Sequence, residues 1–134
     1  MISSTITAYI PCDSRRVWDA LTDAEAYPLW RSGVSRTELT PEGFIEYAPD
    51  GFATRFTVTQ RREGALWAFG VENSRLTGSW QGELRPEGRG TRASFTELVK
   101  PRNPFLLPFI RPYLRRQQRQ FVRCLCAYLA PARD

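Results

Sequence analysis

An alternation of apolar and polar side chains opens the chain. Residues 4–10, STITAYI, place Ile6, Ala8 and Ile10 on one side and threonine or tyrosine on the other. A period of two is typical of a strand with one buried face. The chain is therefore predicted to begin with a β-strand.

Two short helices are predicted after this strand. The turn at residues 11–14 supplies a helix N-cap, after which apolar residues recur at helical spacing up to about Thr22. Asp23 can cap a second short helix. Pro28 is expected to limit that helix at about Tyr27, because proline disfavours helical backbone in the residue before it.

From residue 34 to residue 99 the pattern changes to short β segments separated by turn sequences. The turns contain proline, glycine, asparagine or aspartate, such as Pro49-Asp50-Gly51. Turns spaced this closely favour antiparallel hairpins, and no helical pattern interrupts them. The predicted strands are 34–40, 44–48, 53–61, 65–72, 76–85 and 91–99.

The last part of the chain has the period of a helix. Two prolines, Pro108 and Pro112, place the expected start of the regular helix near Pro112, with a separate turn or a kinked start before it. Pro131 stands just beyond its expected end. Four arginines fall on the outer side: Arg115, Arg116, Arg119 and Arg123. The predicted inner face carries Tyr113, Leu114, Gln117, Phe121, Cys124, Leu125 and Tyr128.

These elements can bury their apolar faces together if the sheet curls around the last helix. We therefore expect one α+β domain over residues 1–134 with a helix-grip fold. In this architecture a curved seven-stranded antiparallel sheet surrounds a long C-terminal helix, and two short helices follow the first strand. The space between the sheet and the long helix is the expected ligand cavity.

The amino-acid composition limits which catalytic and metal-binding sites the chain can form. The chain has no histidine, so the commonest general base and the commonest transition-metal ligand are both missing. Its three cysteines, Cys12, Cys124 and Cys126, form neither a CxxC pair nor an even disulfide framework, and we interpret them as reduced thiols. The opening residues lack the basic and apolar regions of a signal peptide. We expect a cytoplasmic protein with no metal and no cofactor.

The formal net charge of +5 and the pI near 9.6 raise the question of an anionic partner. Arg115, Arg119 and Arg123 are candidates for contact with a membrane surface, and a solvated outer face is the alternative. Nucleic acid is not expected, because no aromatic residues are interleaved on that side to stack on bases. The oligomeric state stays open.

Strand alternation and the helix face assign a set of side chains to the cavity. Aromatic rings there suit a flat apolar ligand, and simple core packing is the alternative. The amide of Gln117, on an otherwise apolar face, needs a partner, either a ligand carbonyl or hydroxyl, or a strand side chain or cavity water. The predicted ligand-binding residues are Phe56, Val58, Trp67, Phe69, Trp80, Phe95, Tyr113, Gln117 and Phe121.

Two carboxylates are predicted to point inward. Glu97 alternates in phase with Phe95 and Val99, so its pKa is expected to rise among apolar groups, and it is a weak candidate for a catalytic acid or base. The alternative is that a strand bulge or a nearby arginine makes it part of an ordinary ion pair. Glu46, in phase with Phe44, is a weaker candidate of the same type.

Three segments resemble one known family. Residues 11–34, PCDSRRVWDALTDAEAYPLWRSGV, resemble the opening of the START-like, Bet v 1-like (SRPBCC) superfamily, in the form shared by bacterial polyketide cyclase/dehydrase and lipid-transport proteins. Residues 84–99 resemble its late hairpin, and NPFLLPFIRPYLRRQQRQFVRCLCAYL resembles its closing helix. For Trp18 and Trp30 in the opening segment we expect a structural role, in which they pack the short helices against the sheet.

The resemblance implies a function class. Its first implication is a binding or carrier protein for a small hydrophobic ligand, such as a lipid, a polyketide or an isoprenoid-like molecule. The alternative is an enzyme of the polyketide cyclase/dehydratase type that acts on a ligand in the same cavity. A third interpretation is a non-catalytic interaction module with a filled core and a working surface at the basic helix.

Overall fold

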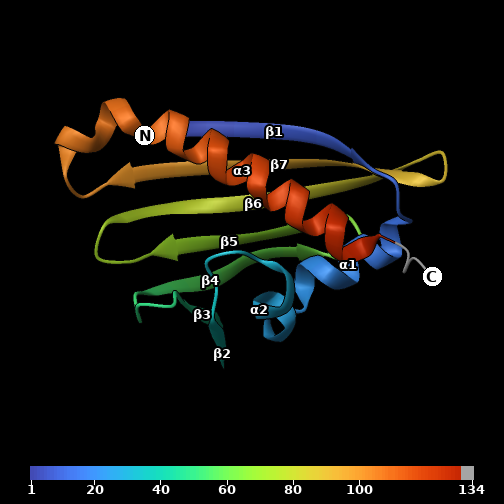
Figure 1. Cartoon of the computed structure of the whole chain (residues 1–134), viewed down its shortest axis with the longest axis horizontal. Coiled ribbons are helices and arrows are strands. Elements are labelled where there is room, and N and C mark those ends of the chain that lie inside the picture. Colours follow the sequence, from blue (N-terminus) through green and yellow to red (C-terminus); the bar gives the residue numbers. More distant parts are fainter. Residues whose placement is uncertain (131–134) are drawn as a thin grey trace.

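The computed structural model describes residues 1–130 and is organised around one seven-stranded antiparallel sheet (Figure 1). The strand order is β1-β7-β6-β5-β4-β3-β2, so the first and last strands of the chain are neighbours. Helix α3 (Leu107–Leu129) crosses one face of the sheet, and the predicted helix-grip fold is confirmed. The strands are β1 (Ile2–Ile10), β2 (Arg36–Thr40), β3 (Gly43–Tyr47), β4 (Ala53–Arg62), β5 (Leu66–Glu72), β6 (Leu76–Glu87) and β7 (Gly90–Pro101).

All seven predicted strands are present, and the largest differences lie in the last hairpin. Strands β6 and β7 extend until Glu87 pairs with Gly90, because Gly88 adopts a positive φ of 58° in the two-residue turn between them. At the other end of this hairpin Leu76 pairs with Pro101. The hairpin is therefore longer at both ends than the turn residues of the sequence indicated.

The two short helices lie after β1, as predicted. In α1 (Ser14–Thr22) the side chain of Asp13 accepts a hydrogen bond from the backbone of Arg16 at 3.1 Å and caps the helix. A 3-10 turn, η1 (Ala24–Ala26), leads into α2 (Tyr27–Trp30). The prediction that Pro28 ends this helix was wrong. It stands in the first turn of α2, where a backbone N–H is not needed.

Helix α3 starts earlier than predicted. It follows the 3-10 turn η2 (Pro104–Leu106) directly, so the expected start near Pro112 was wrong. Pro108 occupies the first turn, and Pro112 removes one hydrogen bond at an exposed position where water can solvate the free carbonyl. Pro131 lies outside the described residues. Within residues 1–130 no helix is long and apolar enough to cross a membrane.

Aromatic side chains fill the space between the sheet and the helices. Trp18 is 1% exposed and meets Trp67 edge to face at 6.5 Å, so it packs α1 against the sheet. Trp30 stacks on Tyr128 at 5.8 Å and meets Phe121 at 5.4 Å, so it packs α2 against α3. The predicted packing against the sheet is confirmed for Trp18, whereas Trp30 packs its short helix against α3.

A buried amide joins α3 to the sheet, and it belongs to Gln118. Its Nε2 donates to the backbone oxygens of Ser4 at 2.8 Å and Phe95 at 3.3 Å, and its Oε1 accepts from the Ser4 hydroxyl at 2.8 Å. Gln118 is 2% exposed, whereas Gln117 is exposed. The predicted burial of Gln117 was wrong. The buried face of α3 consists of Ile110, Leu114, Gln118, Leu125 and Leu129.

Replacing Gln118 tests this anchor. Gln118→Ala is expected to lower the free energy of unfolding by about 2–3 kcal/mol, because two buried carbonyls and a buried hydroxyl lose their partner. Gln117→Ala, one residue away on the same helix but exposed, is expected to stay within about 0.5 kcal/mol of the wild type. Urea unfolding followed by circular dichroism measures both. Equal losses in the two variants would contradict the assignment.

Candidate ligand-binding site

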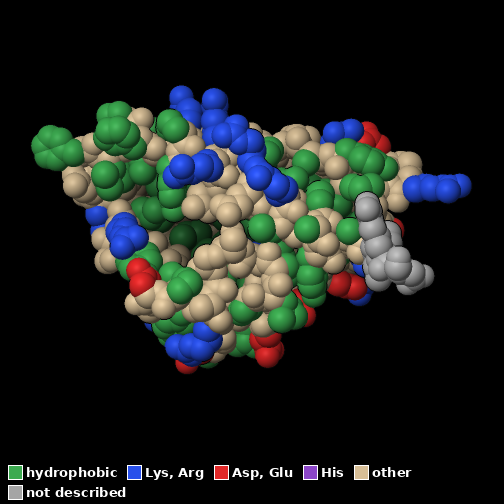
Figure 2. All heavy atoms as spheres, viewed as in Figure 1, with side chains coloured by type: hydrophobic (Ala, Val, Ile, Leu, Met, Phe, Trp, Pro, Cys, Tyr) green, Lys and Arg blue, Asp and Glu red, His purple; other side chains and the backbone are tan. Residues whose placement is uncertain are grey.

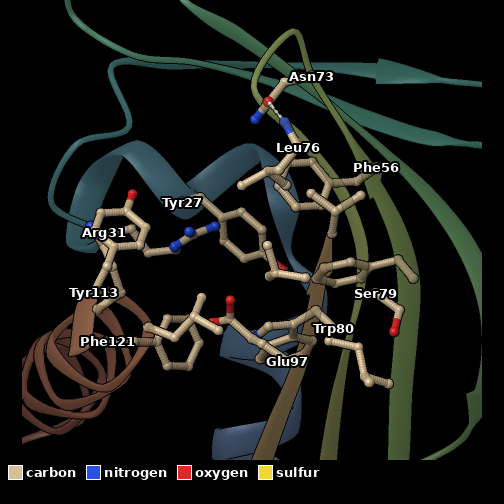
Figure 3. A pocket seen from close by; sticks show the side chains of 16 residues that line it. Tyr27, Arg31, Phe56, Asn73, Leu76, Ser79, Trp80, Glu97, Tyr113 and Phe121 are labelled. Carbon is tan, nitrogen blue, oxygen red and sulfur yellow. Dashed lines mark hydrogen bonds between the residues drawn. The ribbon is translucent and has the colours of Figure 1, made fainter. Parts of the chain in front are cut away.

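A cavity of about 170 Å³ lies between the sheet and α3. It opens at the surface, where Figure 2 shows a hollow beside α3, and Figure 3 shows its lining side chains. Strands β4 to β7, helix α3 and the segment around α2 all contribute. The lining residues are Tyr27, Arg31, Phe56, Phe69, Val71, Asn73, Leu76, Ser79, Trp80, Glu97, Leu98, Val99, Tyr113, Leu114, Gln117 and Phe121.

Most of the predicted ligand-binding residues line this cavity. Three do not: Val58 is partly buried against the core, and Trp67 and Phe95 are buried at 5% and 1% exposure. They face the same side of the sheet, but neighbouring rings cover Trp67 and Phe95, and Val58 packs against the core. The predicted residues that line the cavity are Phe56, Phe69, Trp80, Tyr113, Gln117 and Phe121.

The aromatic wall is held by ring-to-ring packing. Phe69 and Trp80 stack at 4.9 Å, and Phe121 meets Trp80 edge to face at 5.7 Å. A Cβ atom at Gly82 would lie 2.8 Å from the Trp80 Cη2 atom, so a glycine is needed for the indole to lie over its own strand. The wall is therefore formed before any ligand arrives.

Arg31 brings a positive charge to the cavity. It is the residue after α2, and its guanidinium forms an ion pair with Glu46 of β3. It also lies 5.1 Å from the ring centre of Tyr27 and 5.5 Å from that of Phe121, both at cation–π distance. Sequence reasoning did not name Arg31. The inward phase of Glu46 was the available signal, because a buried carboxylate requires a cation.

Glu97 is the acidic group of the cavity wall. Its side chain points into the space that Arg31 also faces (Figure 3), and it makes no hydrogen bond or ion pair with any residue in 1–130. Burial raises the pKa of Glu97 to about 7, and the charge of Arg31 opposes that rise. The predicted inward orientation is confirmed. Near neutral pH this carboxyl can donate or accept a hydrogen bond.

Two further polar groups near the cavity, Glu46 and Tyr27, already have partners. Burial raises the pKa of Glu46, and its ion pair with Arg31 opposes the rise. The Tyr27 hydroxyl donates to the backbone oxygen of Leu21, and burial raises its pKa to about 12. Within the described part of the chain no three acidic or cysteine side chains gather as a metal site would require. Of Glu46, Tyr27 and Glu97, Glu97 is therefore the group that keeps its hydrogen-bonding capacity free for a ligand.

The raised pKa of Glu97 predicts a pH-dependent stability. A carboxyl whose pKa is about 7 in the folded protein and 4.5 in the unfolded chain stabilises the fold fully below pH 4.5. That contribution is lost as the pH rises toward about 7. Glu97→Gln removes the ionisation, so between pH 5 and pH 8 the wild type should lose roughly 2 kcal/mol relative to the variant. Urea unfolding at several pH values measures the difference, and parallel pH profiles would contradict it.

Three solved structures illustrate what this chain is similar to. A START superfamily protein from Mycobacterium smegmatis has a similar structure, with a TM-score of 0.81, 13% identity, and coverage of 95% of this chain and 96% of that one. The protein XoxI from Bacillus cereus gives a TM-score of 0.81 at 13% identity, with 96% of each chain covered. The di-domain ARO/CYC StfQ from the steffimycin biosynthetic pathway gives 0.74 at 18% identity, covering 96% of this chain and 50% of that one.

These structural likenesses, all below 25% identity, establish the fold alone. No curated protein was found to match the chain in sequence. The profile of the family described as polyketide cyclase/dehydrase and lipid transport matches residues 1–130. With the helix-grip fold and an apolar cavity under its long helix, the chain belongs to the polyketide cyclase/dehydrase and lipid transport family.

Proposed function

We propose that this protein is a carrier for a small, mostly apolar molecule with one neutral polar end. The observation that supports this most directly is the preformed aromatic cavity containing one carboxyl group with free hydrogen-bonding capacity. Apolar walls with a few placed polar groups are typical of ligand sites. Burial of the ligand supplies the affinity, and Glu97 orients it.

The size of the cavity limits the ligand. Its 170 Å³ is close to the roughly 150 Å³ of an engineered apolar cavity that binds benzene. Pockets for drug-sized ligands are larger, at about 300–1,000 Å³. A ligand with one or two rings, or a short branched chain, fits these dimensions, and a polycyclic product requires the cavity to enlarge.

The charges favour a neutral polar group on that ligand. Arg31 is already paired with Glu46, so its attraction for a ligand anion is largely offset. A carboxylate on the ligand would also meet the partly ionised Glu97. A hydroxyl or carbonyl avoids both penalties, because Glu97 can accept from the first and donate to the second.

The second candidate function is a cyclase or dehydratase that acts in the same cavity. The raised pKa of Glu97 favours it, since a carboxyl that titrates near neutral pH suits general acid–base catalysis. The family and the ARO/CYC name of StfQ are consistent with it. The carrier proposal has more support, because Glu97 has no second acid or base within hydrogen-bond distance among the described residues.

Binding of naphthol, which has two fused rings and one hydroxyl, tests the carrier proposal. Calorimetry should show saturable binding to the wild type, and Val71→Trp should weaken it at least tenfold by filling the cavity. Thr59→Trp introduces the same ring at an exposed position of β4 and should leave the affinity unchanged. Equal affinities in the two variants would place the naphthol outside the cavity and contradict the proposal.

Native mass spectrometry of protein purified from its own host separates the two functions. A carrier should retain one apolar molecule unchanged, and Val71→Trp should lose it while Thr59→Trp keeps it. An enzyme should instead convert the recovered molecule on incubation, at a rate that Glu97→Gln lowers at least a hundredfold. Conversion of this kind would overturn the carrier proposal in favour of the second candidate.

A further inference from the structure

Four large apolar side chains project from the molecule where η2 meets α3. Phe105 is 84% exposed and Phe109 is 68% exposed, and Leu106 and Leu107 are 40% and 43% exposed. We call these four residues the apolar tip. Large apolar groups scattered singly over a surface are ordinary, but four within five residues form a contiguous patch. Such a patch indicates a binding surface.

The tip lies in a strongly basic part of the chain. Residues 100–130 contain seven basic residues and no acidic one, whereas residues 1–99 contain eleven basic and 13 acidic residues. Figure 2 shows basic side chains along α3, beside the hydrophobic group at the end of the molecule where η2 lies in Figure 1. The seven are Lys100, Arg102, Arg111, Arg115, Arg116, Arg119 and Arg123. Those on α3 are exposed and form no ion pair with any residue in 1–130.

We propose that the apolar tip and the arginines of α3 dock the protein on an anionic lipid membrane surface. The phenylalanine and leucine side chains enter the boundary between headgroups and acyl chains, and the arginines contact the lipid phosphates. Apolar burial and electrostatic attraction act together in this kind of peripheral binding. Neither contribution alone holds a protein of this size stably on a bilayer.

Two other partners fit the same surface less well. In a symmetric dimer built on this face, two helices of like charge would lie against each other. A nucleic acid would contact the arginines, but the two phenylalanines gather at one end instead of alternating with the arginines. Leu106 and Leu107 would gain nothing from bases and would be buried in a membrane.

The proposed docking surface continues into the mouth of the cavity. Phe109 and Tyr113 are one helical turn apart on the same side of α3, a rise of about 6 Å. Tyr113 is 45% exposed and also lines the cavity. A protein docked by the tip therefore holds the cavity mouth close to the lipid headgroups. The docking itself does not depend on the ligand proposed above.

Cosedimentation with vesicles tests the proposal. The full chain should bind vesicles that contain 30% phosphatidylglycerol in phosphatidylcholine, bind pure phosphatidylcholine at least tenfold more weakly, and detach as the salt concentration rises. Phe105→Ser/Phe109→Ser should lower the affinity for the anionic vesicles at least tenfold. Leu29→Ser/Leu39→Ser, which removes two exposed leucines on α2 and β2, should leave it unchanged.

A matched pair of charge variants tests the arginines. Arg115→Glu/Arg119→Glu should abolish binding to the anionic vesicles. Arg85→Glu/Arg89→Glu changes the net charge equally at the exposed β6–β7 hairpin, which lies at the opposite end of the molecule, and should have little effect. Equal losses would show that net charge alone governs the interaction, and that result would overturn the proposal.

Two further measurements keep the alternatives distinguishable. Tip-dependent dimers in sedimentation velocity without vesicle binding would assign the surface to a second copy of the chain. Tighter binding to single-stranded RNA than to vesicles, lost in Arg115→Glu/Arg119→Glu, would assign it to nucleic acid. Val71→Trp should bind vesicles like the wild type, so failure of the cavity proposal does not affect this test.

Discussion

The position of α3 on the sheet depends on the buried side-chain amide of Gln118. Both of its donor hydrogens and its acceptor oxygen are used, against two carbonyls and one hydroxyl of β1 and β7. A buried amide can meet this condition in only one arrangement, so it fixes the helix both in rotation and along its axis. Leu114 and Phe121, one turn to either side, then point at the cavity. The helix wall of the ligand site follows from an interaction that is not itself in the site.

The electrostatics of the cavity depend on one cation that faces two carboxyl groups. Arg31 is engaged by Glu46, and this ion pair offsets only part of the cost of removing the carboxylate from water, because burial still raises the pKa of Glu46. Glu97, on the other side of the cavity, feels Arg31 only at longer range, and burial therefore dominates its ionisation. The same arginine lies between the rings of Tyr27 and Phe121, so α2 and α3 hold it in place. Because Arg31 pairs with Glu46 and not with Glu97, the two carboxyl groups differ chemically: Glu46 is held in an ion pair, and Glu97 can hydrogen-bond a ligand.

The sequence was sufficient for the strands and for the inward face of the sheet, because a period of two leaves little ambiguity. The phase of Glu97 and Glu46 could be predicted for that reason. The helix was harder to orient. Tyr113, Gln117 and Phe121 share a stripe with Leu114, and the apolar pattern could not show that Gln118 lies closer to its centre. A pattern of apolar and polar positions counts every glutamine as polar, so a glutamine whose amide binds backbone carbonyls does not stand out in it.

The site residues that could not be predicted are those whose roles depend on contacts between distant parts of the chain. Arg31 follows a four-residue helix, and its partner Glu46 lies 15 positions further along the chain. No local pattern links the two. Val58, Trp67 and Phe95 have the correct phase but do not line the cavity, because phase defines a face of the sheet and not the part of that face that stays open. Pro28 and Pro112 were expected to bound helices, and each stands inside one where the lost hydrogen bond costs little.

The three prolines around the apolar tip affect how fast and how tightly the tip binds a partner surface. Pro104, Pro108 and Pro112 each fix one backbone φ angle within nine residues, and the side chain of Asn103 caps the turn that begins this stretch. A segment fixed in this way has little backbone entropy left to lose when its phenylalanines become buried. The backbone entropy of this segment is lost once, when the chain folds. Each later contact with a binding partner then costs only side-chain entropy and the displacement of water.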